Sequence, residues 1–210
     1  MKRREFSLSA AAVAAGAVTL PAWAQPREGK DYRKLAKPAP VEAPAGKVEV
    51  VEFFGYFCPH CNTFEPTLNA WAKTAPKDIV LHRVPVNFNA KTVPMQKLYY
   101  TLEGMGKLEP LHAQAFRYIH VERKPLQEDE QVSAWAKGQG LDLPKFKEMY
   151  NSFGVANQIR KATQLQQAYD VEGVPSMGVA GRYYVDGTMA GSMENVLRIV
   201  EQLAAQVRKG

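Results

Sequence analysis

The chain has 210 residues, of which 46% are hydrophobic and 23% charged, a composition typical of a folded globular protein and not of a disordered one. The length allows one domain, or one domain with an insertion. The formal net charge is +6. Because the charged residues near the start (Lys2, Arg3 and Arg4 against Glu5) give +3 − 1 = +2, the rest of the chain carries +4 without a basic cluster, which argues against nucleic acid as a partner.

Residues 1–24 are typical of an export signal. A basic start precedes an apolar run of small residues at 8–20, and Ala22-Trp23-Ala24 supplies a cleavage site before Gln25. The apolar run is too short to anchor the chain in a bilayer. Arg3-Arg4 also resembles a twin-arginine signal, so Sec and Tat export both stay open. Either route would deliver the mature chain to a compartment in which disulfides form.

The next segments predict an extended arm followed by a strand, a helix and a second strand. Residues 25–45 are rich in proline and charge and predict the arm, with a short edge strand at 32–35. Residues 47–54 form an apolar run typical of a strand buried on both faces. Apolar residues at helical spacing in 62–73 predict a helix, and 79–86 predict another strand. This order indicates a βαβ unit.

The only two cysteines, Cys58 and Cys61, lie between that first strand and that helix. A helix that begins there places the first sulfur where the helix dipole and unpaired N–H groups favour an anion, and the thiolate is the reactive form of cysteine. Pro59 suits a first helical turn, and His60 can add a donor or a positive charge beside the sulfur. The pattern predicts a redox-active dithiol in which Cys58 is the exposed nucleophile and Cys61 the buried resolving thiol.

Two other uses of the cysteine pair are disfavoured. A structural disulfide across two intervening residues closes too short a loop to constrain the unfolded chain much. Zinc would need two further ligands, and His112 and His120 have the wrong spacing for a zinc finger. We therefore expect no metal, and no cofactor other than the Cys58–Cys61 disulfide itself.

The pattern then becomes helical from about residue 92 to residue 169. Glycine and proline breaks divide this stretch into helices near 93–105, 108–121, 127–138, 143–151 and 155–169. Two short strands are predicted at 176–179 and 183–185, followed by a turn at Asp186-Gly187 and a closing helix at 193–207. The simplest architecture is an α/β fold interrupted by an all-helical insertion.

Residues 53–61, Phe-Phe-Gly-Tyr-Phe-Cys-Pro-His-Cys, resemble the active-site segment of the DsbA family, the periplasmic thiol:disulfide oxidoreductases of Gram-negative bacteria. Val174-Pro175 matches the cis-proline loop of that family, and the resemblance runs from about residue 31 to the C-terminus. It implies a thioredoxin fold interrupted by an all-helical insertion. Residues 25–88 and 170–210 would form the thioredoxin-like domain and residues 89–169 the insertion, after a signal peptide at 1–24.

The resemblance also implies roles for two acids. The family places a buried acid at the position of Glu52, six residues before Cys58, as a proton acceptor for the second thiol. Glu65, four residues after Cys61, matches a second family acid. The strand pattern itself predicts that Glu52 lies under the helix, with a raised pKa if it is buried. Arg83, on the next strand, is placed to form an ion pair with either acid.

In the family, a cis bond at Val174-Pro175 turns the Val174 backbone N–H and C=O toward an extended substrate. Around this loop Phe57, Phe88 and Met177 are expected to form an apolar groove.

The resulting functional prediction is a periplasmic, monomeric oxidase. It would donate its Cys58–Cys61 disulfide through a mixed disulfide to newly exported, unfolded proteins with reduced cysteines. A quinone-linked membrane protein of the DsbB type would reoxidise it, as the resemblance implies. One alternative is a disulfide isomerase or reductase, although the segment between Gln25 and Lys47 is too short for the N-terminal dimerisation domain of the family's isomerases. The other is a peptide-binding chaperone with an incidental dithiol, whose activity would survive replacement of both cysteines.

Overall fold

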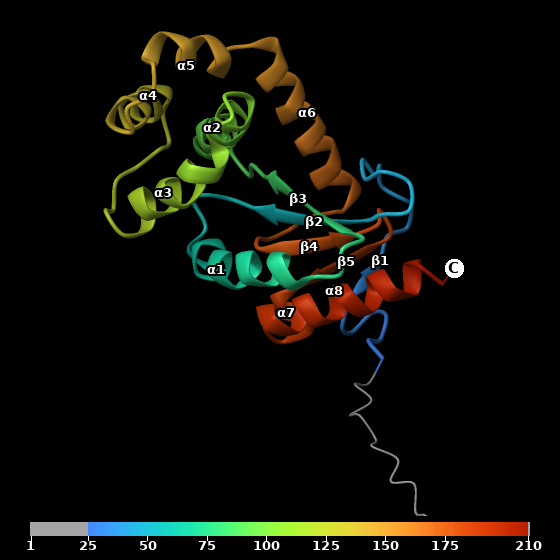
Figure 1. Ribbon diagram of the computed structural model, residues 1–210. Coiled ribbons are helices and arrows are strands. Elements are labelled where there is room, and N and C mark those ends of the chain that lie inside the picture. The colour runs from blue at the N-terminus through green and yellow to red at the C-terminus, as the bar shows by residue number, and fades with distance from the viewer. Residues whose placement is uncertain (1–24, 210) are drawn as a thin grey trace, which may run out of the picture.

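The computed structural model describes residues 25–209, so the predicted signal peptide at 1–24 lies outside the described residues. The elements follow the chain in this order (Figure 1): β1 (Arg33–Lys34), β2 (Val48–Phe54), α1 (Pro59–Thr74), β3 (Ile79–Pro85), a short 3-10 helix (Ala90–Thr92), α2 (Val93–Gly104), α3 (Leu108–His120), α4 (Asp129–Gly138), α5 (Leu143–Tyr150), α6 (Phe153–Ala168), β4 (Ser176–Val179), β5 (Tyr183–Asp186), α7 (Gly187–Ala190) and α8 (Met193–Val207).

The five strands form one mixed sheet in the order β1-β5-β4-β2-β3. The parallel pair β2 and β3 runs from Val48 opposite Ile79 to Phe54 opposite Pro85. On its other side β2 pairs antiparallel with β4, which pairs antiparallel with β5. Every residue of β2 is buried, as the apolar run predicts for a strand with both faces covered.

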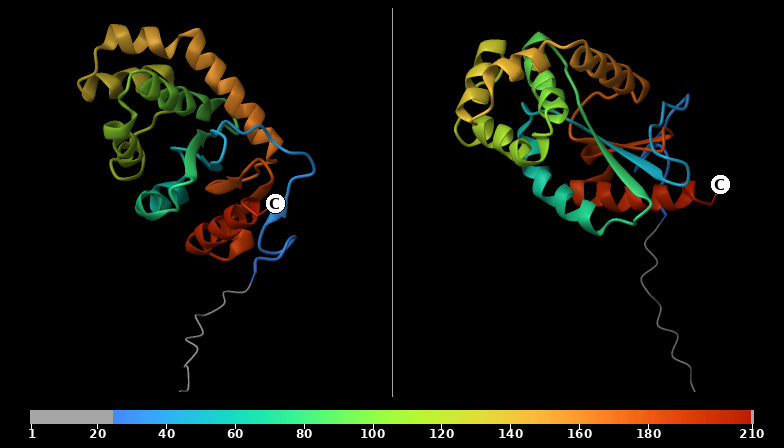
Figure 2. Two further views of the ribbon diagram at one scale, coloured as in Figure 1. Left: turned by 45° about the vertical axis from the view of Figure 1, so that its right-hand side comes forward. Right: turned by 45° about the horizontal axis from the view of Figure 1, so that its top comes forward.

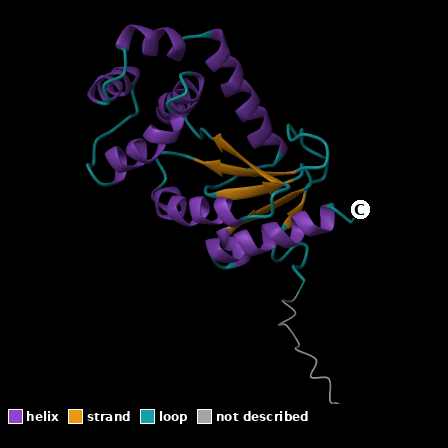
Figure 3. Cartoon of the chain, in the orientation of Figure 1, coloured by secondary structure: helices purple, strands orange, loops and turns teal. Residues whose placement is uncertain are grey.

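Helices cover both faces of the sheet (Figure 3). Helices α1 and α8 lie side by side on one face (Figure 2). Their apolar sides close one buried cluster with Val48 and Val50 of β2 and with Met177 and Val179 of β4. This packing fixes α1 directly against β2, and with it the residues at the beginning of α1.

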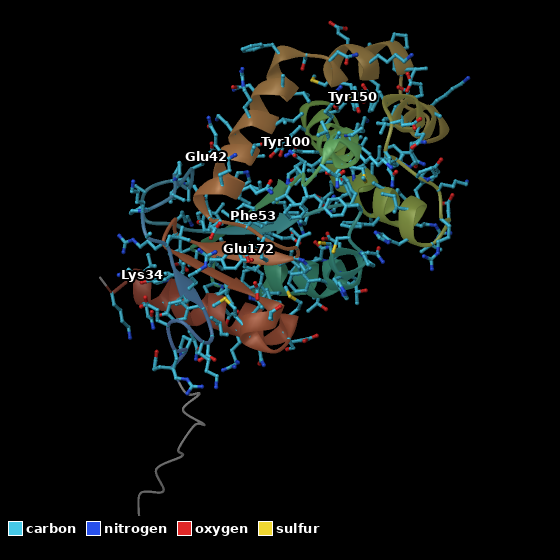
Figure 4. The ribbon with its side chains drawn as sticks, turned by 180° about the vertical axis from the view of Figure 1, so that it is seen from behind. Lys34, Glu42, Phe53, Tyr100, Tyr150 and Glu172 are labelled. Carbon is cyan, nitrogen blue, oxygen red and sulfur yellow. The ribbon has the colours of Figure 1, made fainter. Side chains whose placement is uncertain are left out.

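The insertion consists of α2 to α6 and lies beyond the other face and one edge of the sheet (Figure 1). Phe53 of β2 points toward it and packs on Tyr169, with ring centroids 5.1 Å apart (Figure 4). Within the insertion the Tyr150 hydroxyl donates to Asp129, at 2.7 Å, and thereby ties α5 to α4. The α/β architecture with an all-helical insertion is the one that the sequence predicts. Within residues 25–209 no helix is long and apolar enough to cross a membrane.

Helix α1 begins at Pro59 with Cys58 as its N-cap, as predicted for a helix that starts at the cysteine pair. The prediction at Asp186 differs from the structure. Asp186 does not start a simple turn, because its carboxylate accepts the Met189 N–H at 2.9 Å and caps the short helix α7. Aspartate favours turns and helix N-caps alike, so the sequence alone left this choice undecided.

Candidate active site

Cys58 is the residue at which β2 turns into α1. Its backbone is extended (φ −89°, ψ 118°), and its N–H donates to the Gly55 carbonyl at 3.0 Å. The Cys58 carbonyl accepts the first helical bond, from Asn62 N–H at 3.2 Å. Its sulfur meanwhile accepts the Cys61 backbone N–H at 3.4 Å. The side chain thus occupies the capping position that serine or aspartate usually takes, where the free N–H groups of the first turn converge.

This position gives the two thiols opposite acidities. A hydrogen bond from the Cys61 thiol, together with the backbone N–H groups of Cys61 and His60 and the charge of His60, lowers the pKa of Cys58 to about 6, although partial burial opposes the change. Burial, and then the neighbouring Cys58 sulfur, raise the pKa of Cys61 far above its ordinary value. The site therefore favours one thiolate and one neutral thiol.

Cys61 is buried, as predicted, but Cys58 is more enclosed than the sequence suggests. Cys58 is 6% exposed and Cys61 1% exposed, so the expectation of an exposed nucleophile is wrong, although Cys58 remains the more accessible of the two. Pro59 and His60, between them, are exposed. A loop from the far end of the chain covers Cys58, since the Cys58 thiol donates to the Val174 carbonyl at 3.2 Å.

The Val174-Pro175 peptide bond in this loop is cis, as expected from the resemblance. Strand β4 begins immediately after it, with Ser176 paired to Phe53 of β2. Because β2 leads into the dithiol and β4 leads out of the Val174 loop, this pairing brings two segments that are distant in sequence to the same end of the sheet. Pro175 is buried there, and Val174 is half-buried.

A buried carboxyl group lies beneath the dithiol on β2. Glu52 is 1% exposed, and its Oε2 accepts a hydrogen bond from Arg83 Nε at 3.1 Å. Its Oε1 has no hydrogen-bond partner. Burial, reinforced by the charge of Glu65 and opposed by Arg83, raises the pKa of Glu52 to about 8. At neutral pH this side chain is therefore mostly the protonated acid, and it can still release its proton.

A second carboxylate, Glu65 on α1, completes an ion-pair network with Arg83. Its Oε1 accepts from Arg83 Nη2 at 3.2 Å and from Asn69 Nδ2 at 2.9 Å, and it lies 3.3 Å from His112 Nε2. Burial alone would raise the pKa of Glu65, but His112, Arg83 and Asn69 together bring it below the ordinary value. Arg83 thus contacts both acids that the sequence singles out.

Sequence reasoning did not identify His112 and His120 as neighbours of the segment that precedes Cys58. His112 lies 2.8 Å from the Tyr56 hydroxyl through Nδ1, and His120 Nε2 lies 2.8 Å from the Tyr56 carbonyl. Both belong to α3, so the insertion contacts the residue two positions before Cys58. The sequence feature that could have identified them is their spacing of eight residues, which places two histidines on one face of a helix.

Two of the three residues predicted for the groove lie together. Phe57 and Phe88 meet edge to face, with centroids 6.1 Å apart, and Phe88 is 44% exposed. Met177 is fully buried in the cluster beneath α1 and α8, so its assignment to a substrate groove is wrong. Met177 lies directly opposite Glu52 in the sheet, on the face that α1 covers.

The arrangement can perform thiol–disulfide exchange. It combines a thiol that ionises readily, a second thiol held neutral, and a buried carboxyl able to take up or release a proton next to them. Among residues 25–209, no group of three or more His, Cys, Asp or Glu side chains is placed to hold a metal ion.

Comparisons with known proteins agree with this chemistry. The family model described as a DSBA-like thioredoxin domain matches residues 49–200. The thiol:disulfide interchange protein DsbA of Bordetella pertussis is 43% identical over 211 residues, which cover 100% of both chains. The protein of the same name from Pseudomonas aeruginosa is 41% identical over 86% of this chain and 85% of its own.

Solved structures give the same result for the fold. The crystal structure of Pseudomonas aeruginosa DsbA superposes with a TM-score of 0.81 at 40% identity, over 86% of this chain and 94% of that one. The oxidoreductase DsbA from Xylella fastidiosa gives a TM-score of 0.82 at 30% identity, over 89% of this chain and 100% of that one. The fold of the present chain is therefore a thioredoxin fold interrupted by a helical insertion.

Proposed function

The chain belongs to the DSBA-like thioredoxin domain family and is a thiol:disulfide oxidoreductase, and we propose that it acts as an oxidase for newly exported, unfolded proteins in the periplasm. One observation carries the proposal: Cys58, at the start of α1, is the thiol with the lowered pKa, and Cys61 is held neutral. A site that stabilises the reduced thiolate makes the corresponding disulfide a stronger oxidant.

In the proposed reaction a substrate thiolate attacks Sγ of Cys58 in the Cys58–Cys61 disulfide. The bond between the two cysteines breaks, Cys61 leaves with the electron pair, and a mixed disulfide joins Cys58 to the substrate. A second substrate thiolate then attacks the substrate sulfur of that mixed disulfide. Cys58 leaves as the thiolate that the helix N-terminus stabilises, and the substrate keeps the new disulfide. The exchange uses the cysteine pair itself and needs no other cofactor.

Glu52 is the proposed proton carrier for Cys61. When Cys61 leaves as a thiolate, the Glu52 carboxyl supplies a proton, and when Cys61 must react again, the Glu52 carboxylate takes the proton back. A pKa of about 8 for Glu52 supports both directions, since each form is accessible near neutral pH. Arg83 and Glu65 would then set the charge around Glu52, and His60 would help to hold the Cys58 thiolate.

Substrate is proposed to bind along the Val174 loop. The Val174 carbonyl lies 3.2 Å from Sγ of Cys58, so a peptide whose backbone N–H groups pair with this carbonyl would bring its own cysteine to the reactive sulfur. Phe57 and the half-exposed Phe88 offer apolar surface beside it. Unfolded chains expose such backbone groups and apolar side chains, which suits a broad substrate range.

The remaining assignments follow from the same chemistry and fold. A DsbB-type, quinone-linked membrane protein is proposed to reoxidise the monomeric protein. We assign residues 25–88 and 170–210 to the thioredoxin-like domain and residues 89–169 to the insertion, since the first two stretches build the sheet and the third supplies α2 to α6.

Oxidised protein mixed with reduced, unfolded ribonuclease A tests the proposal. We expect disulfides to appear in the ribonuclease in proportion to the oxidised protein added, and none with Cys58→Ser or Cys61→Ser. We also expect equilibration with glutathione to give a potential more oxidising than that of glutathione. A potential near about −270 mV, that of thioredoxin, would identify a reductase instead. If the protein still promotes refolding of the ribonuclease after both cysteines are replaced, it acts as a chaperone.

A further inference from the structure

His112 is a buried histidine at the boundary between the helical insertion and the sheet. It is 8% exposed, and its ring centroid lies 5.3 Å from the ring centroids of Phe54, Tyr56 and Phe116. Tyr99 of α2 lies somewhat farther away, at 5.9 Å. A polar ring inside such an aromatic enclosure costs free energy unless its nitrogens have partners. The polar groups that face those nitrogens therefore decide what the ring can do.

The two ring nitrogens face different chemistry. Nδ1 lies 2.8 Å from the Tyr56 hydroxyl, and Nε2 lies 3.3 Å from Oε1 of Glu65. A hydroxyl can donate to the neutral ring or accept from the protonated one. The Glu65 carboxylate lies within ion-pair distance of Nε2, which makes no hydrogen bond within residues 25–209. The site is thus compatible with both protonation states of His112, and Glu65 supplies the negative charge that the protonated state needs.

Glu65 connects His112 to the proposed proton carrier. Arg83 bonds to Glu65 through Nη2 at 3.2 Å and to Glu52 through Nε at 3.1 Å, so one guanidinium serves two buried carboxyl groups. The charge of Glu65 is one of the causes that raise the pKa of Glu52. If Arg83, which contacts both acids, is the sole positive charge that residues 25–209 supply to them, only one of the two acids can be ionised without leaving an excess negative charge in a buried site.

We propose that His112 is a positioning residue for the reaction. Its protonated ring compensates the negative charge of Glu65, which leaves Arg83 free to compensate Glu52 when Glu52 must lose its proton. This inference rests on the proton-carrier role proposed above for Glu52. His112 contributes no atom to the exchange. It compensates the charge of Glu65, and thereby favours the ionised form of Glu52 that accepts the Cys61 proton.

The other ionisable groups around His112 do not take this role. They are Glu65 on α1, Arg83 on β3 and Glu52 on β2, with Tyr56 before α1 and Tyr99 on α2. Burial raises the pKa of both tyrosines, so they remain neutral phenols near pH 7. Arginine stays charged throughout. Besides Arg83, His112 is the side chain of this group that can carry a positive charge.

The step affected is closure of the Cys58–Cys61 disulfide. With glutathione disulfide as the oxidant, the Cys58 thiolate attacks one of its sulfurs, and glutathione leaves as a thiolate. The Glu52 carboxylate then takes the proton of Cys61, and the Cys61 thiolate attacks Sγ of Cys58. The Cys58–Cys61 bond forms, and the second glutathione leaves with the electron pair of the broken bond. An ionised Glu52 is needed only in this second step.

The test is the pH dependence of ring closure in the whole protein. Reduced protein is mixed rapidly with increasing glutathione disulfide, and the first-order plateau at saturation is followed from about pH 6 to pH 9. For His112→Gln we expect the midpoint of this profile to move upward by about one pH unit, and the plateau at pH 7 to fall up to about tenfold. The second-order attack by Cys58 at low oxidant should stay unchanged.

His120→Gln is the matched control. His120 lies on the same helix and contacts the Tyr56 carbonyl, and its ring stacks on Phe116, whereas the ion pair with Glu65 belongs to His112. It should keep the wild-type midpoint. In a Glu65→Gln background, His112→Gln should cause no further shift, because the charge that His112 compensates is gone. Equal shifts for both histidine variants, or an undiminished shift without Glu65, would overturn the inference.

A measurement on the intact fold covers the case in which His112→Gln does not fold. The chain has four histidines, so carbon-13 labelling of their rings resolves the titration of His112 by NMR. Because Glu65 is the carboxylate that faces His112 at 3.3 Å, Glu65→Gln should reduce the protonated fraction of His112 at pH 7 and leave that of His120 unchanged. An unchanged His112 would overturn the inference.

The two proposed roles fail separately. If Glu52→Gln slows ring closure but His112→Gln leaves its pH profile unchanged, His112 has no positioning role and the oxidase proposal stands. If Glu52→Gln itself leaves ring closure unaffected, the proton-carrier role of Glu52 is wrong, and the inference about His112 falls with it.

Discussion

The backbone N–H of Cys61 donates to the sulfur of Cys58, 3.4 Å away, so the first cysteine of the pair caps the helix that contains the second. One turn of α1 thereby gives two chemically identical thiols different roles. The sulfur at the cap receives N–H groups that favour its anion, and the sulfur one turn later is buried away from them.

The first prediction concerns the reactivity of these thiols. In the reduced protein, iodoacetamide should modify Cys58 with a midpoint near pH 6 and leave Cys61 unmodified. His60→Leu removes a charge and keeps the backbone N–H, so we expect it to raise the midpoint by up to about one pH unit. Alkylation across pH with mass spectrometric mapping of the site measures both. A wild-type midpoint near the ordinary thiol value of 9.0 would contradict the proposed role of the helix start.

The second prediction concerns the stability of the reduced protein. Because the folded pKa of Cys58, about 6, lies below its ordinary value of 9.0, the thiolate contributes stability that is complete above pH 9 and is lost as the pH falls through 6. Between about pH 5 and pH 8 the reduced form should gain about 1–2 kcal/mol over the oxidised form, after screening of the partly accessible sulfur is allowed for.

Urea unfolding of the two redox forms at each pH measures this difference. The reduced Cys58→Ser variant is the control, and its free energy of unfolding should lack the corresponding rise with pH. A pH-independent difference between the redox forms would show that the Cys58 thiolate gains nothing from folding.

The third prediction concerns Glu52, for which the sign is opposite. Its folded pKa of about 8 lies above the ordinary 4.5, so the folded state holds the proton more tightly and stability is lost as the pH rises from 4.5 to 8. Glu52→Gln keeps the shape and removes this titration. Relative to wild type, its free energy of unfolding should increase by about 3 kcal/mol between about pH 5 and pH 8.

Denaturant unfolding across this range checks the third prediction. Glu109→Gln makes the same replacement on the exposed side of α3 and should leave the pH dependence of wild type unchanged. If Glu52→Gln behaves like Glu109→Gln, then Glu52 is ionised in the folded protein at neutral pH.

Much of the fold could be predicted because its elements have strong local patterns. The strand Ser176–Val179 and the helix Met193–Val207 have the predicted bounds, since apolar residues at a clear period are bounded by residues that end each element. The ion pair between Arg83 and Glu52 could also be predicted from the sequence. Two parallel strands joined by one helix place Glu52 opposite Arg83, and this is the register observed.

The rest of the site depends on how distant segments dock. His112 comes from the insertion, and its contact with Glu65 follows from the packing of α3 against α1, for which neither segment carries a local pattern. The misplacement of Met177 was avoidable. It pairs with Glu52 and shares its sheet face with Val179, so the two-residue period of a strand already directs it beneath α1.

The last prediction concerns the apolar surface beside the dithiol. Phe88 is 44% exposed, and its ring meets the edge of Phe57, the residue before Cys58. Phe88→Ala removes aromatic contact area, worth about 0.5–1.5 kcal/mol, that only an extended protein substrate can use. We therefore expect the KM for a reduced, unfolded protein to rise by about 2–10-fold, with kcat and the rate of reaction with glutathione unchanged.

Phe153→Ala is the matched control, because Phe153 is 77% exposed at the start of α6 and belongs to no part of the site described above. Steady-state oxidation of the protein substrate by both variants separates the outcomes. An equal KM for the two variants, or a Phe88→Ala protein that is slower with glutathione as well, would show that Phe88 supports the fold of the site and does not bind substrate.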